Sequence, residues 1–283
     1  MRWTVTGATG MLGTDLTTLL RERGDDVVAL GRSELDITDP GAVEAAIEGA
    51  DVVVNCAAHT AVDAAEDHES DAFLVNAVGP STLARATAAR GQRLVHFSTD
   101  YVFDGDGRSP YEEDAPIRPR SAYGRTKAAG EWAIRSQQPD HLIIRTAWLY
   151  GASGPCFPKS IANAASTRDT LQVVDDQVGQ PTWTRDLADL AVRLVVADAV
   201  AGTYHGTSRG SGSWFDFAQA VVSAAGRDPR MVERTTSDAL ARPARRPPYS
   251  VLGHDALRAV GVEPIGDWRE RWAAAAPQVL ARS

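Results

Sequence analysis

Cysteine, lysine and long apolar segments are all scarce in this sequence. Its 283 residues include two cysteines, Cys56 and Cys156, which lie a hundred positions apart and have no metal-ligand spacing. This pattern favours reduced thiols in a cytoplasmic protein. The apolar stretches are too short, or too interrupted by charge, to reach the roughly 18 to 20 residues that cross a bilayer. Because a strand-like run already begins at Trp3, we expect neither a secretion signal nor a membrane partner.

Positive charge is also in deficit. The sequence has 29 basic against 37 acidic residues, a formal net charge of −8. This balance argues against broad binding to the phosphates of nucleic acid, so an anionic ligand must be held by a local site. A hydrophobic fraction of 43% is typical of a globular protein. The length allows one large α/β domain or two smaller lobes.

The first half of the chain alternates short β-rich runs with helix-period segments. This order predicts an α/β fold, a doubly wound parallel sheet of Rossmann type covered by helices on both faces. We expect strands at Trp3–Val5, Val27–Leu30, Val52–Cys56, Leu94–Phe97 and Leu142–Arg145. We expect helices at Thr14–Arg23, Gly41–Glu48, Asp71–Arg90, Ala122–Ser136 and Thr184–Val196.

After Tyr150, turns rich in glycine and proline break this rhythm into shorter elements, which predicts a second, smaller α/β substrate lobe. Residues 1–148, with 184–200 returning to the sheet, are expected to form the dinucleotide-binding domain. Residues 149–183 and 201–265 are expected to form the substrate lobe, and 266–283 a C-terminal helix.

A glycine-rich turn joins the first strand to the first helix. It contains Gly7, Gly10 and Gly13 at the G-x-x-G-x-x-G spacing. Gly7 permits a tight turn, Gly10 lets a pyrophosphate approach the backbone, and Gly13 lets the helix pack on the strand. Met11 and Leu12 open the helix, whose N-terminal amides would face the phosphates. The strand before and the helix after indicate a dinucleotide site rather than a merely flexible turn.

The end of the second strand distinguishes the two nicotinamide dinucleotides, because an acidic side chain there binds a ribose 2′-hydroxyl and a basic one a 2′-phosphate. Arg32 and Ser33 stand there. A guanidinium can fork onto a phosphate, so the sequence favours NADPH and leaves NADH open. Asp36 and Ile37 are candidates for bordering the adenine, although Asp36 fits a turn before Asp39 equally well.

Tyr123 and Lys127 are the strongest catalytic candidates. They lie four residues apart in a segment that Ser121 can cap as a helix, so they share one face. A neighbouring ammonium would lower the pKa of a phenol from about 10 and make it a better proton donor near neutral pH. The chain has only two lysines, 27 of its 29 basic residues being arginine, so such a pair seldom arises by chance. An ordinary exposed helix pair is the alternative.

A polar cluster ends the fourth expected strand. The run Ser98-Thr-Asp-Tyr-Val-Phe-Asp-Gly105 lies at the carboxyl end of that strand, where open α/β sheets bind ligands. Thr99 or Ser98 can hydrogen-bond to a substrate carbonyl. Asp100 and Asp104 have the look of a carboxylate pair, but Asp104 followed by glycine is more simply a turn.

Six motifs together carry a family resemblance. They are Thr6-Gly-Ala-Thr-Gly-Met-Leu-Gly13, Asn55-Cys-Ala-Ala-His-Thr60, the run Ser98–Gly105, Tyr123-Gly-Arg-Thr-Lys127, Arg145-Thr-Ala-Trp148 and Gly179-Gln-Pro-Thr182. The chain resembles an extended short-chain dehydrogenase/reductase and, more closely, the dTDP-4-dehydrorhamnose reductase family, from Met1 to about Leu252. The glycine loop and the Tyr-x-x-x-Lys pair define only the superfamily, whereas the third and fifth motifs are more specific.

The resemblance implies roles for individual residues. Three match the family's catalytic threonine, tyrosine and lysine: Thr99, Tyr123 and Lys127. Three match positions that line the sugar site beside Thr99 and Tyr123: Thr60, Tyr101 and Trp148, the last with a buried core aromatic as alternative. Cofactor contacts are implied for Tyr123 and Lys127 and for Ala57, Ala58 and Asn76. His59 departs from the family, because a tyrosine is common there. Asp15 and residues 184–186 do not supply the carboxylates of a magnesium-bridged dimer, so we expect no metal and leave a homodimer open.

The implied reaction is NADPH-dependent reduction of the C4 ketone of dTDP-4-dehydro-L-rhamnose to dTDP-L-rhamnose, with Tyr123 as proton donor, Thr99 polarising the carbonyl and Lys127 tuning Tyr123. Three arginines, Arg242, Arg245 and Arg246, are candidates for holding the nucleotide diphosphate, or form a solvated basic loop. The alternatives are a 4-ketoreductase for another nucleotide-activated deoxysugar and a non-catalytic NADP-binding regulatory subunit, against which the presence of both Tyr123 and Lys127 speaks.

Overall fold

Six parallel strands form the central sheet of the computed structural model, which describes residues 1–240 and 242–281. Their spatial order is β2, β1, β3, β4, β5 and β10. The bounds are Asp26–Leu30, Arg2–Thr6, Val52–Asn55, Arg93–Thr99, His141–Thr146 and Gly202–His205. The order reverses direction between β1 and β3, and parallel α/β sheets bind ligands at such a point. The expected fold class is confirmed.

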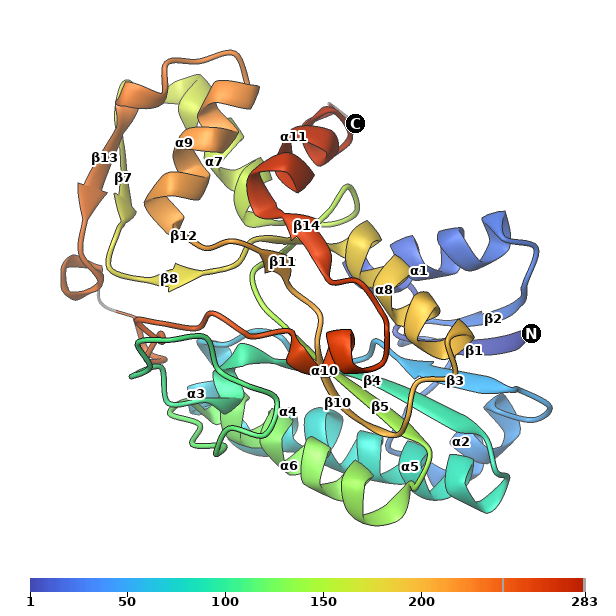
Figure 1. Ribbon diagram of the computed structural model, residues 1–283. Coiled ribbons are helices and arrows are strands. Elements are labelled where there is room, and N and C mark those ends of the chain that lie inside the picture. The colour runs from blue at the N-terminus through green and yellow to red at the C-terminus, as the bar shows by residue number, and fades with distance from the viewer. Residues whose placement is uncertain (241, 282–283) are drawn as a thin grey trace.

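Helices cover both faces of this sheet, as Figure 1 shows. Helices α1 (Met11–Glu22) and α8 (Thr184–Val196) pack on one face, where their leucines meet strand side chains in one apolar core. The other face is covered by α2 (Pro40–Ala46), α5 (Gly79–Ala89) and α6 (Ala122–Gln137). Strands β3 and β4 are buried along almost their whole length because helices cover both sides, and their valines, leucine and phenylalanine made them easy to predict.

The single helix expected over 71–90 is interrupted in the structure. Helix α4 (Glu69–Phe73) runs into a π-helical turn over Leu74–Val78 before α5 begins. Pro80 lacks the N–H that would bond to the carbonyl of Asn76. That carbonyl instead faces Gly130 of α6, where an added Cβ would lie 2.2 Å from it. The missing N–H of Pro80 and the close contact with α6 together explain why the hydrogen-bonding pattern changes from α-helical to π-helical here.

The second lobe contains α7 (Phe157–Thr167), β7 (Leu171–Val174), α9 (Trp214–Ala224), β13 (Val232–Thr235) and α11 (Trp268–Val279). Its core is aromatic, built on Tyr150, Phe217 and Trp272. Residues 282 and 283 of the expected C-terminal helix lie outside the described residues. The paired strands β6 (Leu149–Tyr150) and β9 (Thr182–Trp183) lead into and out of the lobe.

The expected boundary at residue 201 is wrong. Residues 202–205 form β10, the sixth strand of the central sheet, and α10 (Asp255–Ala259) contributes Leu257 to the core beneath α8. After α8 the chain adds a parallel strand beside β5. Four residues with a glycine at one end were too short a signal for that strand.

A buried ion pair fastens α6 to β5. Arg145 and Glu131 are both buried and form two hydrogen bonds of 2.9 Å. Arg145 also donates to the carbonyl of Glu113 and lies 3.4 Å from the imidazole of His205. The pair therefore joins α6, two strands and the 105–120 loop.

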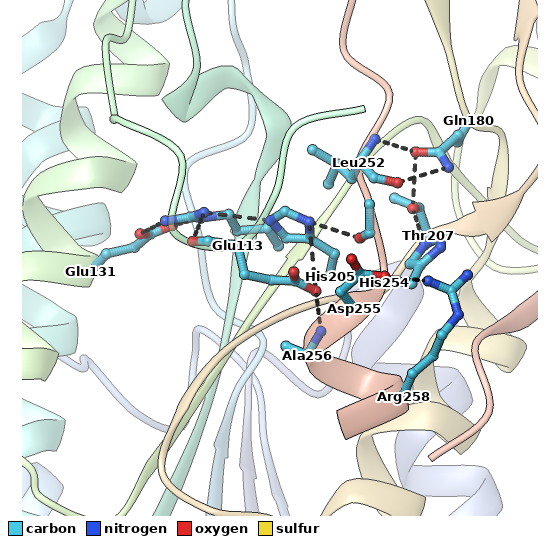
Figure 2. A network of polar contacts seen from close by, with 12 residues as sticks. Glu113, Glu131, Gln180, His205, Thr207, Leu252, His254, Asp255, Ala256 and Arg258 are labelled. Atoms are coloured by element: carbon cyan, nitrogen blue, oxygen red, sulfur yellow. Dashed lines mark hydrogen bonds and ion pairs between the residues drawn. The ribbon is translucent and has the colours of Figure 1, made fainter. Parts of the chain in front are cut away.

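Gln180, in the Gly179–Thr182 motif, joins chain segments that lie far apart in the sequence (Figure 2). Its amide oxygen accepts from the Leu252 N–H at 2.8 Å and the Thr207 hydroxyl at 3.0 Å. Its NH₂ donates to the carbonyl of Ser208 at 2.9 Å. The Gly179–Thr182 motif thus has a structural role. Within the described part of the chain, none of the helices is long and apolar enough to cross a membrane.

Candidate active site

The glycine loop has the geometry that the spacing predicts. Gly7 has a positive φ of 66°, and an added Cβ there would lie 2.5 Å from the Ala57 nitrogen. A Cβ on Gly13 would lie 2.2 Å from the carbonyl oxygen of Gly7. Gly10 caps α1 without a side chain, so the amides of Met11 and Leu12 are left for a ligand. The loop fits an anionic pyrophosphate.

The end of β2 presents Arg32 and Ser33 to solvent. Asp36 uses its carboxylate on the N–H and hydroxyl of Thr38, at 2.9 and 2.7 Å, so it adopts the turn role. Ile37 is buried against Gly79 rather than displayed on the surface. Glu34, which no sequence motif marks, also orders this turn, because its carboxylate accepts from the N–H of Gly31 at 2.6 Å.

The chain segment after β3 lies against the glycine loop. Ala57 and Ala58 are half-buried there, Ala57 touching Gly7. Asn76 is fully buried behind them, and its amide bonds to both main-chain groups of His59 at 2.8 and 3.0 Å and to Thr126 at 3.1 Å. Asn76 therefore holds this segment in place.

Tyr123 and Thr99 meet where α6 begins beside the end of β4. The Ser121 hydroxyl caps α6 by accepting from the N–H of Gly124 at 3.1 Å. The rings of Tyr101 and Tyr123 meet edge to face at 5.6 Å. The Thr99 hydroxyl donates to Asp100 at 2.9 Å and accepts from the N–H of Tyr101 at 3.2 Å. The structure thus brings Thr99, Tyr101 and Tyr123 together.

Burial sets the charge states of this cluster. It raises the pKa of Tyr123 to about 12, although a hydrogen bond with Thr99 opposes the rise. It also raises the pKa of Asp100 to about 6. Tyr123 is consequently a protonated phenol at neutral pH, able to give a proton.

The expected lowering of the Tyr123 pKa by Lys127 is not what the structure gives. The Lys127 Nζ is buried and donates to the carbonyl of Phe97 at 2.6 Å, and it lies 3.3 Å from Nε2 of His96. Burial lowers the pKa of Lys127 to about 8, against the nearby charge of Glu131. Its amine is therefore anchored to β4, with a weaker hold on its proton than a surface lysine has.

A cavity of about 1110 Å³ opens between the second lobe and the cluster, and Tyr101 lines it. Trp214, Gln177 and the three predicted arginines also line it. Arg246 is already paired with Asp63 by two hydrogen bonds of 2.7 and 2.8 Å, which hold the pKa of Asp63 below its usual value. Arg242 and Arg245 are exposed and make longer ion pairs, at 3.9 and 3.6 Å. The guanidinium groups of Arg242 and Arg245 are therefore more available to bind an anion than that of Arg246.

Trp148 sits in a strained backbone conformation beside this cavity. Its φ is 48°, in the left-handed region that residues other than glycine seldom adopt. Its ring stacks on Trp214 with centroids 3.7 Å apart. Such strain persists where the surroundings enforce it, often at functional sites. Thr60 is exposed at the end of its segment.

Gly179→Ala is expected to break the Trp148 stack. An added Cβ would lie 2.5 Å from Cε2 of Trp148, whose other face is occupied by Trp214. We expect a stability loss of about 1–3 kcal/mol from this overpacking, with a changed tryptophan emission, measured by urea unfolding and fluorescence. Gly202→Ala, where the nearest atom would be 4.0 Å away, is the matched control. Equal results for the two variants would contradict the prediction.

The residues weighed for a metal have other partners. Asp15 accepts a hydrogen bond from Thr184, and Asp186 forms two hydrogen bonds of 2.7 Å with Arg271. Among residues 1–240 and 242–281, no group of three or more histidine, cysteine or acidic side chains is arranged to hold a metal ion.

Comparisons with known proteins cover almost the whole chain. The family model described as "RmlD substrate binding domain" matches residues 1–280. The dTDP-4-dehydrorhamnose reductase of Streptomyces griseus is 50% identical, over 100% of this chain and 95% of its own. A probable dTDP-4,6-dihydroxy-2-methyloxan-3-one 4-ketoreductase of Streptomyces antibioticus is 49% identical, over 99% and 96%.

A solved structure extends these comparisons. It is dTDP-4-dehydrorhamnose reductase from Bacillus anthracis in complex with NADP. The two chains are 34% identical and superpose with a TM-score of 0.93, covering 97% of this chain and 98% of the other.

Proposed function

Because the chain belongs to the dTDP-4-dehydrorhamnose reductase family, we propose that it reduces the C4 ketone of dTDP-4-dehydro-L-rhamnose with NADPH, giving dTDP-L-rhamnose. The motif resemblance in the sequence is confirmed by the family model and the relatives. The observation that carries the proposal is the juxtaposition of Thr99, Tyr101 and Tyr123 beside an arginine-lined cavity.

The chain's own residues fit the cofactor. Gly7 and Gly13 allow the loop to pack tightly, since an added Cβ at either would overlap the protein backbone, and the first-turn amides of α1 offer donors to a diphosphate. Arg32 and Ser33 stand where a 2′-phosphate is recognised. Lys127 and Tyr123 would hold the nicotinamide end. Bound NADPH supplies the hydride.

Tyr123 gives the reaction its proton. The buried phenol donates to the oxygen of the former ketone as negative charge develops there. The one proton of the Thr99 hydroxyl is held by Asp100 in the structure, so polarising the ketone requires that hydroxyl to turn toward the substrate. Tyr101 and Trp148 flank the sugar, and Arg242 and Arg245 meet the diphosphate.

A second candidate is reduction of another dTDP-linked 4-keto-6-deoxysugar. The observation in its favour is the similarity to the Streptomyces antibioticus 4-ketoreductase, which nearly equals that to the Streptomyces griseus enzyme. The two functions share the acid and the cofactor site, so the residues around the sugar decide between them.

The deciding experiment follows NADPH consumption. The protein is mixed with enzymatically generated dTDP-4-dehydrorhamnose, and the product is identified by NMR. We expect dTDP-L-rhamnose. Turnover of a different 4-keto sugar nucleotide alone would favour the second candidate, and cofactor binding without turnover of any would revive a regulatory subunit.

Arg32→Ala is expected to weaken the binding of NADPH but not that of NADH. Hydrogen bonds to a charged phosphate contribute about 1.5–3 kcal/mol, so KM for NADPH should rise by roughly one to two orders of magnitude while KM for NADH stays nearly constant. Steady-state kinetics with both cofactors measures this. Arg227→Ala, an exposed arginine of the second lobe, is the control. An equal rise for both cofactors would remove Arg32 from 2′-phosphate recognition.

We also propose that this enzyme is cytoplasmic and that it is able to form a homodimer. Its support is the resemblance together with the two cysteines, both free in the structure. Light scattering in solution measures the oligomeric state directly.

A further inference from the structure

His96, which has no role in the scheme above, lies beside Lys127. Its imidazole is buried in β4, with Nε2 3.3 Å from Nζ of Lys127 and Nδ1 3.0 Å from Nδ2 of Asn55. Asn55 in turn accepts from the N–H of Ala57, the residue that touches Gly7. One hydrogen-bonded chain thus runs from the glycine-loop contact to the catalytic amine.

The direction of this chain follows from its first donor. The N–H of Ala57 can only donate, and it lies 3.0 Å from Asn55, so the amide oxygen of Asn55 faces it. The NH₂ of Asn55 therefore faces His96, and Nδ1 of His96 must accept. Burial and then the charge of Lys127 hold the pKa of His96 well below its ordinary 6.5. The ring is neutral, and its single proton is on Nε2.

This N–H points at the Lys127 nitrogen. A neutral amine accepts it through the lone pair and still donates to the carbonyl of Phe97, which satisfies every member of the chain. An ammonium has no lone pair, so two donors oppose each other in a buried site, which costs free energy. The other titratable groups that act on Lys127 are Glu131 on its own helix and Cys56 after β3, and both favour the ammonium.

We propose that His96 is a positioning residue, which presents a fixed hydrogen-bond donor to Lys127 and so promotes release of the proton from its ammonium. The consequence for catalysis rests on the proposed function. Lys127 is proposed to hold the nicotinamide end of the cofactor, and an ammonium has one more N–H to donate there than a neutral amine, so His96 sets the alkaline limit of activity.

The two lysines of the chain make a direct test practicable. Protein labelled with ¹³C at lysine Cε gives two NMR signals, which Lys159→Arg assigns. In the ligand-free protein we expect Lys127 to titrate below the ordinary lysine value of 10.5. His96→Phe keeps a ring but removes both nitrogens. This variant should raise the pKa of Lys127 by about one unit, because the N–H of His96 no longer faces an N–H of the Lys127 ammonium. The alkaline limb of kcat/KM should move upward by the same amount.

An unchanged Lys127 pKa in His96→Phe overturns the proposal, because burial alone would then explain the amine. If that variant fails to fold, imidazole ¹⁵N spectra of the wild-type protein decide. A proton on Nε2 of His96 supports the proposal, and a proton on Nδ1 overturns it. An upward pKa shift in a protein that turns over no sugar nucleotide would refute the proposed function and leave the role of His96 standing.

Discussion

Tyr123→Phe is expected to lower kcat by about 10²–10⁴-fold while leaving NADPH binding nearly intact. The substitution removes one oxygen, which is the only proton-donating atom of the side chain, and general acid catalysis typically contributes this much. The aromatic ring keeps its edge-to-face contact with Tyr101. Steady-state kinetics measures the turnover, and NADPH fluorescence titration measures the binding.

Tyr204→Phe is the matched control for this variant. The Tyr204 hydroxyl donates to the carbonyl of Val200 at 2.7 Å, at the distant end of β10, so its loss should leave kcat unchanged. Wild-type turnover in Tyr123→Phe would remove the proposed acid. Equal losses in both variants would point to damage to the fold instead.

Glu131→Gln is expected to destabilise the protein by about 3–5 kcal/mol. The amide keeps the shape of the side chain but leaves the Arg145 guanidinium buried without a counter-charge. Urea unfolding measures the loss. Asp189→Asn, which breaks the exposed pair with Arg193, should cost less than about 1 kcal/mol. Similar losses in the two variants would show that the buried pair is not special.

The effect of Glu131 should depend on pH in one direction. Burial alone would raise the pKa of this carboxyl, but the hydrogen bonds and charge of Arg145 outweigh it and hold the pKa below the ordinary 4.5. The wild-type advantage is therefore full above pH 4.5 and shrinks as the pH falls through the lower folded value. An advantage that grows on acidification would contradict this assignment.

The sheet and the cofactor loop were predictable because their signals are local. Strand β3 begins with three valines, β1 and β4 are rich in β-branched and aromatic residues, and the glycines at 7, 10 and 13 mark the turn by their spacing alone. Ser121 is a typical N-cap residue and marked the start of α6, so Tyr123 and Lys127 could be assigned to one face of that helix from their spacing. These features depend on neighbours in sequence, which the sequence displays.

The remainder depended on contacts between distant segments. Asp63 pairs with Arg246, which lies 183 residues later in the sequence. The stack of Trp148 on Trp214 joins the two lobes. The role of His96 was visible only as an inward-facing polar residue in an apolar strand. The expected effect of Lys127 on Tyr123 failed because helix spacing does not say which way a long side chain turns in a buried site.

The indole pair of Trp148 and Trp214 is an internal spectroscopic probe of the distance between the two rings. Two aromatic chromophores 3.7 Å apart and tilted by 8° couple their electronic transitions, and the coupling decays steeply with separation. The near-ultraviolet circular dichroism of the resting enzyme should therefore carry an exciton contribution from this pair. A ligand that parts the two rings would extinguish it, so the entry of a sugar nucleotide can be timed without any added dye.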